Sequence, residues 1–233
     1  MMTFVTGEQP YYRDRPDAGK QLAARLGGYC DNCVVFGVPN GGIPIAAEVA
    51  RQFNADMDVV VVRKLHIPSN PEAGFGAVTT DGSPVYNKPL MKRLGLNDRE
   101  VQKLADQVRS EIDSRSASYR GDRPFPWLVG KVAIIVDDGM ASGYTMAAAI
   151  KSVRNHRAGK VVAAAPVASE SAFQIVKTLA DDVVCPIVSK SSWFSVAGFY
   201  QNWHDLSDGE ALAVLKDFRK EQEAAATSSN IRK

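Results

Sequence analysis

The sequence has no apolar run that could cross a bilayer, a span that takes about 20 apolar residues in a helix. Its longest apolar runs, such as 59–62 and 161–165, are far shorter than that. The opening residues, MMTFVTGEQPYYRDR, have no basic start followed by an apolar core, so they predict no signal peptide. We therefore expect a cytoplasmic protein with no membrane partner.

The sequence also has little net charge and few cysteines. The 28 Lys and Arg residues nearly balance the 26 Asp and Glu residues, and no basic block stands out, so we expect no nucleic-acid partner. Of the three cysteines, Cys30 and Cys33 form a CxxC pair and Cys185 stands alone. A structural zinc site needs two more ligands, and a thioredoxin-like pair opens a helix, whereas this pair precedes an apolar strand. We expect reduced thiols, with a zinc or redox role as the lesser alternative.

Apolar, β-branched runs alternate with amphipathic segments along most of the chain. The runs predict strands at 33–38, 56–65, 131–138, 160–168 and 182–188, and the amphipathic segments predict helices at 17–29, 41–53, 97–119, 145–157, 169–180 and 207–223. Asn97 is the expected cap of the third helix, and Asp81–Gly82 the expected turn of a short hairpin. This alternation predicts an α/β fold with a mostly parallel, twisted sheet flanked by helices.

We expect one domain over residues 1–223 and a flexible tail over 224–233. Its core spans about 17–190, and a small hood comes from 66–96, from 191–206, or from both. The Pro- and Gly-containing stretch after residue 65 predicts a flexible loop. Ligands of parallel sheets bind at the carboxyl ends of strands. Three candidate segments follow predicted strand ends: Pro39–Pro44, Arg63–Lys64 and Asp137–Thr145.

The segment VAIIVDDGMASGYT, residues 132–145, combines two acids with a glycine- and hydroxyl-rich helix entry. Backbone N–H groups at a helix N-terminus can bind a phosphate, and glycine lets the backbone approach it closely. Two carboxylates would repel a bare phosphate, so the ligand should also carry hydroxyls or a divalent metal, as a sugar phosphate does. The alternative is that one aspartate only caps the helix. No Lys precedes the Ser/Thr as a Walker loop requires.

This segment resembles the phosphoribosyl pyrophosphate (PRPP) signature of type I phosphoribosyltransferases, in particular the subfamily of predicted phosphoribosyltransferases. The resemblance implies that the acid pair binds the 2′ and 3′ hydroxyls of the ribose and that the loop binds the 5′-phosphate. It also implies Mg²⁺ at Asp137 and Asp138, held mostly through ligand oxygens and water. The implied PRPP-binding residues are Asp137, Asp138, Gly139, Ala141, Ser142, Gly143, Tyr144 and Thr145.

Two further segments resemble the part of the family site that binds pyrophosphate. VPNGGIPIAAEVA, residues 38–50, is similar to the pyrophosphate loop, and VVVVRKL is similar to the element with an Arg-Lys pair. The implied pyrophosphate-binding residues are Pro39, Asn40, Gly41, Gly42, Arg63 and Lys64. Related sequences carry Arg where Asn40 stands, so this loop lacks a positive charge beside the leaving group. The alternatives are an Asn-Gly turn at a helix entry and two cations that extend to solvent.

The late segment WFSVAGFYQNW resembles the tail of the same subfamily. It implies that Trp193, Phe194 and Tyr200 form a hood over a base, whereas ordinary packing is the alternative. His66 is expected to lie on an exposed loop, and His156 and His204 are expected to be structural.

The resemblance implies a pentosyltransferase of nucleotide and nucleoside metabolism. Such an enzyme transfers the 5-phosphoribosyl group from PRPP to a nitrogen nucleophile, a nucleobase or similar small molecule, with Mg²⁺, and releases pyrophosphate. The implied catalytic residues are Asp137, Asp138, Arg63 and Lys64. A homodimer is the family expectation. A non-catalytic PRPP- or nucleotide-binding sensor and an unrelated sugar-phosphate enzyme are the alternatives. The acceptor, and which aspartate acts as a base, do not follow from the sequence.

Overall fold

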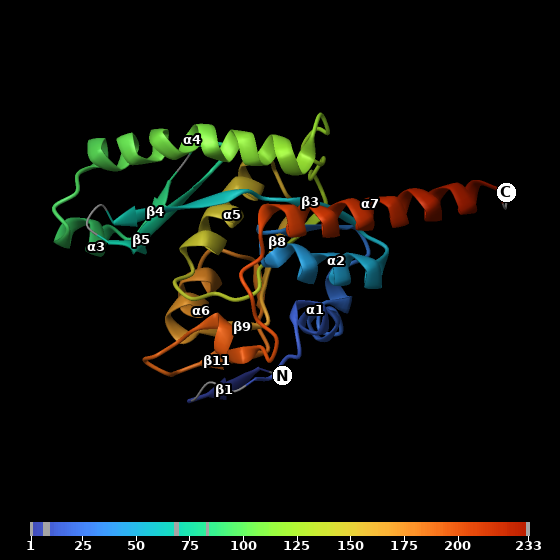
Figure 1. The fold of residues 1–233 in the computed structure, drawn as a ribbon, viewed down its shortest axis with the longest axis horizontal. Helices are drawn as coiled ribbons and strands as arrows, with labels where there is room; N and C mark the ends of the chain where they lie inside the picture. The colour runs from blue at the N-terminus through green and yellow to red at the C-terminus, as the bar shows by residue number, and fades with distance from the viewer. Residues whose placement is uncertain (1, 7–9, 68–69, 83, 232–233) are drawn as a thin grey trace.

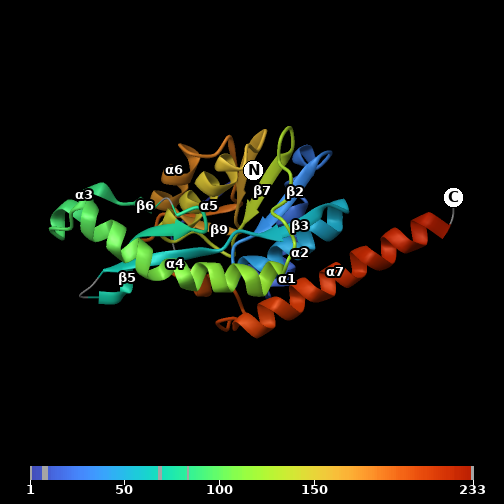
Figure 2. The same ribbon diagram turned by 90° about the horizontal axis from the view of Figure 1, so that it is seen from above.

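The fold is built on a parallel sheet, seen in Figures 1 and 2. The structure is a computed structural model that describes residues 2–6, 10–67, 70–82 and 84–231. Within these residues the central sheet has the strand order β10-β8-β7-β2-β3, with every pair parallel. Its strands are β2 (Cys33–Gly37), β3 (Asp56–Val59), β7 (Val132–Val136), β8 (Lys160–Ala164) and β10 (Asp182–Val184). The predicted mostly parallel sheet is confirmed.

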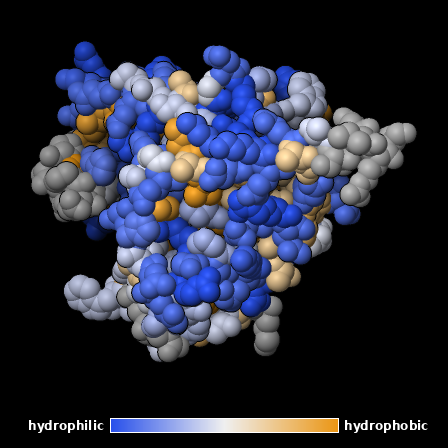
Figure 3. All heavy atoms as spheres, turned by 45° about the vertical axis from the view of Figure 1, so that its right-hand side comes forward, coloured by the Kyte–Doolittle hydropathy of each residue, from blue (hydrophilic) through white to orange (hydrophobic). Residues whose placement is uncertain are grey.

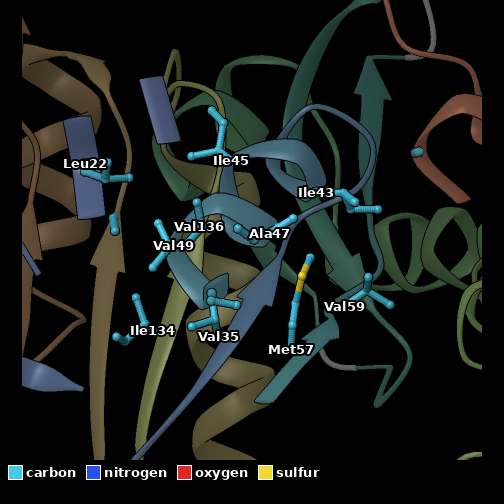
Figure 4. Close-up of a cluster of buried hydrophobic side chains, with 14 of the residues drawn as sticks. Leu22, Val35, Ile43, Ile45, Ala47, Val49, Met57, Val59, Ile134 and Val136 are labelled. Atoms are coloured by element: carbon cyan, nitrogen blue, oxygen red, sulfur yellow. The ribbon is translucent and has the colours of Figure 1, made fainter. Parts of the chain in front are cut away.

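Helices cover both faces of this sheet because alternate strand residues point to opposite sides. Val35 of β2 belongs to the cluster formed with α1 (Arg15–Ala23) and α2 (Gly42–Phe53). Val34 and Phe36 belong to the cluster on the other face, formed with α5 (Tyr144–Asn155) and α6 (Glu170–Lys177). Figure 4 shows the first cluster, where side chains of α2 gather with those of β2, β3 and β7. The core therefore fixes the ends of the strands that carry the predicted site.

A second parallel sheet, in the order β1-β11-β9, continues the paths of two central strands. It consists of β1 (Thr3–Val5), β9 (Val167–Ser169) and β11 (Ile187–Ser189). The runs 160–168 and 182–188, each predicted as one strand, are therefore two strands in different sheets. Pro166 and Pro186 stand at the two breaks, where a residue without an N–H cannot continue a ladder.

The run 56–65 is also divided. Val60 N still donates to Gly37 O at 3.1 Å, and the chain then enters an antiparallel sheet in the order β4-β5-β6. Its strands are β4 (Val62–Ile67), β5 (Asn70–Thr79) and β6 (Val85–Tyr86), and α3 (Lys88–Arg93) follows. The predicted turn at Asp81–Gly82 is confirmed between β5 and β6, with Gly82 at φ +77°.

The predicted hood segment at 66–96, with its flexible loop, thus consists largely of strands and a helix. Residues 68, 69 and 83 lie outside the described residues. The predicted helix over 17–29 begins at Arg15 instead and ends at Ala23, and a 3₁₀ turn follows at Gly27–Tyr29. A further 3₁₀ turn, Val196–Phe199, lies in the other hood segment.

Two long helices complete the chain. α4 (Asp98–Arg120) packs on β4 and β5, and α7 (Asp208–Ile231) packs on α2. Asn97 caps α4 as predicted, since its side chain accepts a hydrogen bond from Glu100 N at 3.0 Å and Glu100 accepts one from Asn97 N. α7 continues to Ile231, so most of the tail predicted as flexible is helical, and residues 232–233 lie outside the described part. Its far end projects from the body (Figures 1 and 2).

Among the described residues, no helix is both long enough and apolar enough to cross a bilayer. On the face drawn in Figure 3, hydrophobic residues form small groups among hydrophilic ones.

Candidate functional site

One cavity of about 580 Å³ brings together the three segments predicted from the sequence. Pro39, Asn40 and Gly41 line it after β2, and Arg63 and Lys64 line it from β4. The segment after β7 contributes Asp137, Asp138, Gly139, Met140, Ala141, Ser142 and Gly143, with Thr145 and Met146 of α5. The remaining lining residues are Arg15, Val38, Arg115, Val196, Trp203, Asp205 and Leu206. Residues of all three predicted segments thus line one cavity, although Arg63 and Lys64 reach it from within β4 rather than from the end of a central strand.

The loop that leads into α5 has the geometry of an anion site. Gly143 adopts φ +79°, a backbone conformation that favours glycine, and no side chain of the described residues caps the helix. No backbone N–H of residues 141–145 donates to another described residue. Two hydrogen bonds fix the loop to β9: Ser169 Oγ donates to Ala141 O at 2.7 Å, and Met140 N donates to Val167 O at 2.9 Å. Unused donors at a helix start can bind a phosphate.

Not every residue predicted for this loop lines the cavity. Ala141, Ser142, Gly143 and Thr145 do. Tyr144 instead packs, partly buried, against the core cluster beside α5 and α6. The phosphate-binding role predicted for the Tyr144 residue can therefore rest only on its backbone N–H.

The surroundings of Asp137 and Asp138 disfavour the charged form of both carboxyl groups. Burial raises the pKa of the Asp137 carboxyl well above its usual range, and the charge of Asp138 adds to the rise. Burial also raises the pKa of Asp138, although Arg15 opposes that rise. Lys64 opposes the rise in the pKa of Asp137, but no described residue forms an ion pair with Asp137. Two neighbouring, half-buried carboxylates with one ion-pair partner favour a bound cation.

Arg15 is a site residue that the sequence reasoning missed. Its side chain is 6% exposed, and its Nε lies 2.9 Å from Asp138 Oδ2. Nη1 donates to His204 O at 2.9 Å, and the guanidinium carbon lies 3.9 Å from the centre of the Trp203 ring. The one sequence signal is a cation at the first position of a helix, where the helix dipole disfavours it. That signal is weak and does not identify a partner 123 residues away.

The loop after β2 approaches the acid pair very closely. A Cβ on Gly41 would lie 1.8 Å from Asp138 Oδ2, so any other residue there would displace the Asp138 carboxylate. The Pro39–Asn40 peptide is cis. Gly42 needs correction as a predicted ligand, because it is buried, does not line the cavity, and donates its N–H to Val38 O at 3.0 Å.

The predicted Arg-Lys pair lies within β4 rather than at the end of a central strand. Arg63 forms an ion pair with Glu111 of α4. Lys64 is exposed and makes no ion pair with another described residue. Both residues line the cavity that holds the acid pair, so β4 brings two cationic groups to it.

The predicted hood aromatics also need correction, because none of them lines the cavity. Trp193 is 87% exposed, and Phe194 packs on Phe199 with ring centres 5.6 Å apart. Tyr200 is buried and donates its hydroxyl to Asp138 O at 2.7 Å, so it supports the acid loop. The aromatic residue at the cavity is Trp203, which the tail pattern did not single out.

The remaining candidates lie outside the cavity. His66 is exposed, His156 stacks on Phe125 at 3.7 Å, and His204 meets Glu210 at 3.1 Å. The three cysteines are unpaired thiols. No group of three or more His, Cys, Asp or Glu side chains among the described residues is arranged to hold a metal ion.

Comparisons with known proteins agree with this geometry. Residues 17–200 match the family model described as "Phosphoribosyl transferase domain". Two Mycobacterium tuberculosis proteins, "Putative phosphoribosyl transferase MT0597" (strain CDC 1551 / Oshkosh) and "Putative phosphoribosyl transferase Rv0571c" (strain ATCC 25618 / H37Rv), are each 38% identical over 205 residues. That alignment covers 88% of this chain and 46% of theirs, so the chain spans about half the length of these relatives. The crystal structure of TT1426 from Thermus thermophilus is 34% identical, with a TM-score of 0.74 over 89% of this chain and 98% of that one.

Proposed function

The chain belongs to the phosphoribosyl transferase family, and we propose that it transfers the 5-phosphoribosyl group of PRPP to a nucleobase-like nitrogen nucleophile, releasing pyrophosphate. One observation carries the proposal. A single cavity holds two adjacent carboxylates, Asp137 and Asp138, beside the unused backbone N–H groups of residues 141–145. Carboxylates accept hydrogen bonds from vicinal hydroxyls, and the amides bind a phosphate. A phosphorylated pentose carries both groups.

The other side chains of the cavity fit the departure of pyrophosphate. Arg63 and Lys64 offer positive charge, and the loop 39–41 offers backbone close to the acid pair. Fixed cations and dipoles stabilise negative charge that develops in a transition state. The charge of the acid pair stabilises the positive charge that builds on the ribose as the bond to pyrophosphate lengthens.

The residues present fit a magnesium ion. Asp137 and Asp138 supply hard oxygen ligands, Asp137 has no ion-pair partner among the described residues, and no third acidic or imidazole ligand converges on them there. Mg²⁺ is commonly held by one or two carboxylates together with substrate oxygens and water. Asp137 and Asp138 would hold it, and the ion would neutralise charge on the diphosphate.

Calorimetry with PRPP tests the site. We expect binding that depends on Mg²⁺ and is lost in Asp137→Asn and Asp138→Asn, with Asp113→Asn, an exposed residue of α4, as the matched control. PRPP binding that survives both site substitutions would reject the proposed ribose site. Circular dichroism of each variant checks the fold.

A non-catalytic PRPP sensor is the second candidate, and the neutral Asn40 favours it because the loop itself brings no side-chain charge to the leaving group. Pyrophosphate release with a panel of purine and pyrimidine bases separates the two functions. Release with any base supports the transferase. Tight PRPP binding with no pyrophosphate release for any base supports the sensor.

A further inference from the structure

Arg115 reaches the cavity from α4, far in sequence from every segment recognised as a site. Its side chain is 16% exposed and lines the cavity together with Arg63 and Lys64. It lies beside the loop 39–41, since its Nη2 donates to Asn40 Oδ1 at 2.6 Å and to Asp208 Oδ1 at 2.5 Å. α4 therefore places a guanidinium at the end of the cavity that this loop borders.

The guanidinium retains unused donors. An arginine has five N–H donors, and the hydrogen bonds of Arg115 to described residues both come from Nη2. Nε is buried without a partner among those residues. A buried donor without an acceptor is unfavourable, and the described residues provide none for the Arg115 Nε–H.

Asn40 cannot provide the charge that its loop lacks, because its side chain is neutral and already engaged. Its amide nitrogen donates to Leu206 O at 2.7 Å and to Asp208 Oδ1 at 3.0 Å. Its amide oxygen accepts from Arg115 and from Tyr119 Oη at 2.8 Å. Asn40 thus joins the loop to α4 and to the start of α7, and the cation bonded to the loop is Arg115.

The cations at this end also repel one another. Arg115 lies close enough to Arg63 to lower the pKa of its guanidinium, after the larger effect of burial. Arg63 is paired with Glu111 and Arg115 with Asp208, while Lys64 has no ion pair among the described residues. A ligand with several negative charges would satisfy the spare donors and relieve this repulsion.

We infer that Arg115 is a diphosphate-binding residue of this site, which supplies from α4 the positive charge that Asn40 does not. The inference rests on the proposed function, because it takes the anion at this end of the cavity to be the pyrophosphate group. Asp208 accepts a hydrogen bond from the guanidinium in the structure, and a diphosphate oxygen would replace it as the acceptor.

Calorimetry with two partial ligands, pyrophosphate and ribose 5-phosphate, in the presence of Mg²⁺ tests the inference. Loss of a charged hydrogen-bonding group predicts that Arg115→Met weakens pyrophosphate binding about 10- to 100-fold. Ribose 5-phosphate binding should stay within about twofold of the wild type, since that ligand lacks the diphosphate. The control is Arg99→Met, an exposed arginine about 24 Å away along the same helix, judged from the helical rise per residue.

Asp208→Asn should change the affinity for pyrophosphate in the opposite direction. It removes the acid that competes for Arg115, so we expect pyrophosphate to bind about two- to fivefold more tightly. A purely structural Arg115–Asp208 pair predicts unchanged or weaker binding. The Asp208 variant decides the matter if Arg115→Met fails to fold.

The outcomes separate this inference from the function on which it rests. If the wild type binds neither pyrophosphate nor ribose 5-phosphate, the proposed function and the inference both fall. If the wild type binds both ligands but Arg115→Met binds pyrophosphate equally well, or loses both ligands equally, only the inference falls.

Discussion

Gly41→Ala should damage the protein through a single side chain, the carboxylate of Asp138. Gly41 has φ −65° and ψ −30°, which alanine adopts without strain, so its backbone conformation predicts no penalty. The added Cβ would lie 1.8 Å from Asp138 Oδ2. That oxygen must retreat by at least about 1.2 Å before the separation reaches 3.0 Å, below which Cβ contacts are essentially never found.

The retreat disturbs the ion pair of Asp138 with Arg15. Asp138 Oδ2 lies 2.9 Å from Arg15 Nε, and Arg15 cannot readily follow because His204 O and the Trp203 ring hold it. Complete loss of one partner from a buried pair costs about 3–5 kcal/mol. We therefore expect Gly41→Ala to lower the free energy of unfolding by up to about that amount in guanidinium titrations followed by circular dichroism.

A double-mutant cycle tests this cause. In an Asp138→Ala background the carboxylate is gone, so Gly41→Ala should cost less than about 1 kcal/mol there, or stabilise slightly. Gly28→Ala is the matched control, because no atom of the described residues, its chain neighbours aside, lies within 4 Å of its added Cβ. An equal cost of Gly41→Ala in both backgrounds would show that the contact with Asp138 is not the cause.

Two further predictions concern stability. Asn97→Ala removes the cap of α4 and should cost about 0.5–2 kcal/mol in urea unfolding, whereas Gln107→Ala, on the exposed face of the same helix, should change it by less than about 0.5 kcal/mol. Burial raises the pKa of the Cys185 thiol from 9.0 to about 12, so the folded state keeps a proton that the unfolded state loses. The resulting stabilisation is complete below pH 9 and declines between pH 9 and 12. Unfolding titrations from about pH 8 to 11 should show a shallower decline for Cys185→Ala, and equal slopes would contradict this.

The parts of the site that the sequence predicted are those whose residues are contiguous. The loop 137–145 could be predicted from one stretch of sequence, because its acids, glycines and hydroxyls adjoin one another and follow a strand. Arg15, Arg115 and Trp203 could not be predicted this way. Each is a single residue on a helix or connecting segment with no site motif around it, and only the packing of α1, α4 and the segment before α7 brings it to the cavity.

The fold shows the same division between local and long-range information. Hydrophobic periodicity predicted the parallel sheet and the helices. Pro166 and Pro186 mark two of the strand breaks directly in the sequence. The break at Val60–Val61 has no such mark, since four valines continue across it. It arises because Val60 makes the last hydrogen bond to β2, after which the chain pairs with β5 instead.

Asp138 shows why the acid pair needs these distant residues. Its carbonyl oxygen accepts from Tyr200 Oη, its carboxylate from Arg15, and Gly41 leaves room for it. Contacts that fix one carboxylate and neutralise one charge therefore offset the cost of removing two adjacent carboxylates partly from water. Asp137 has no ion pair among the described residues to neutralise its own charge. That unpaired carboxyl is the physical reason to expect a cation to accompany any phosphorylated sugar into this cavity.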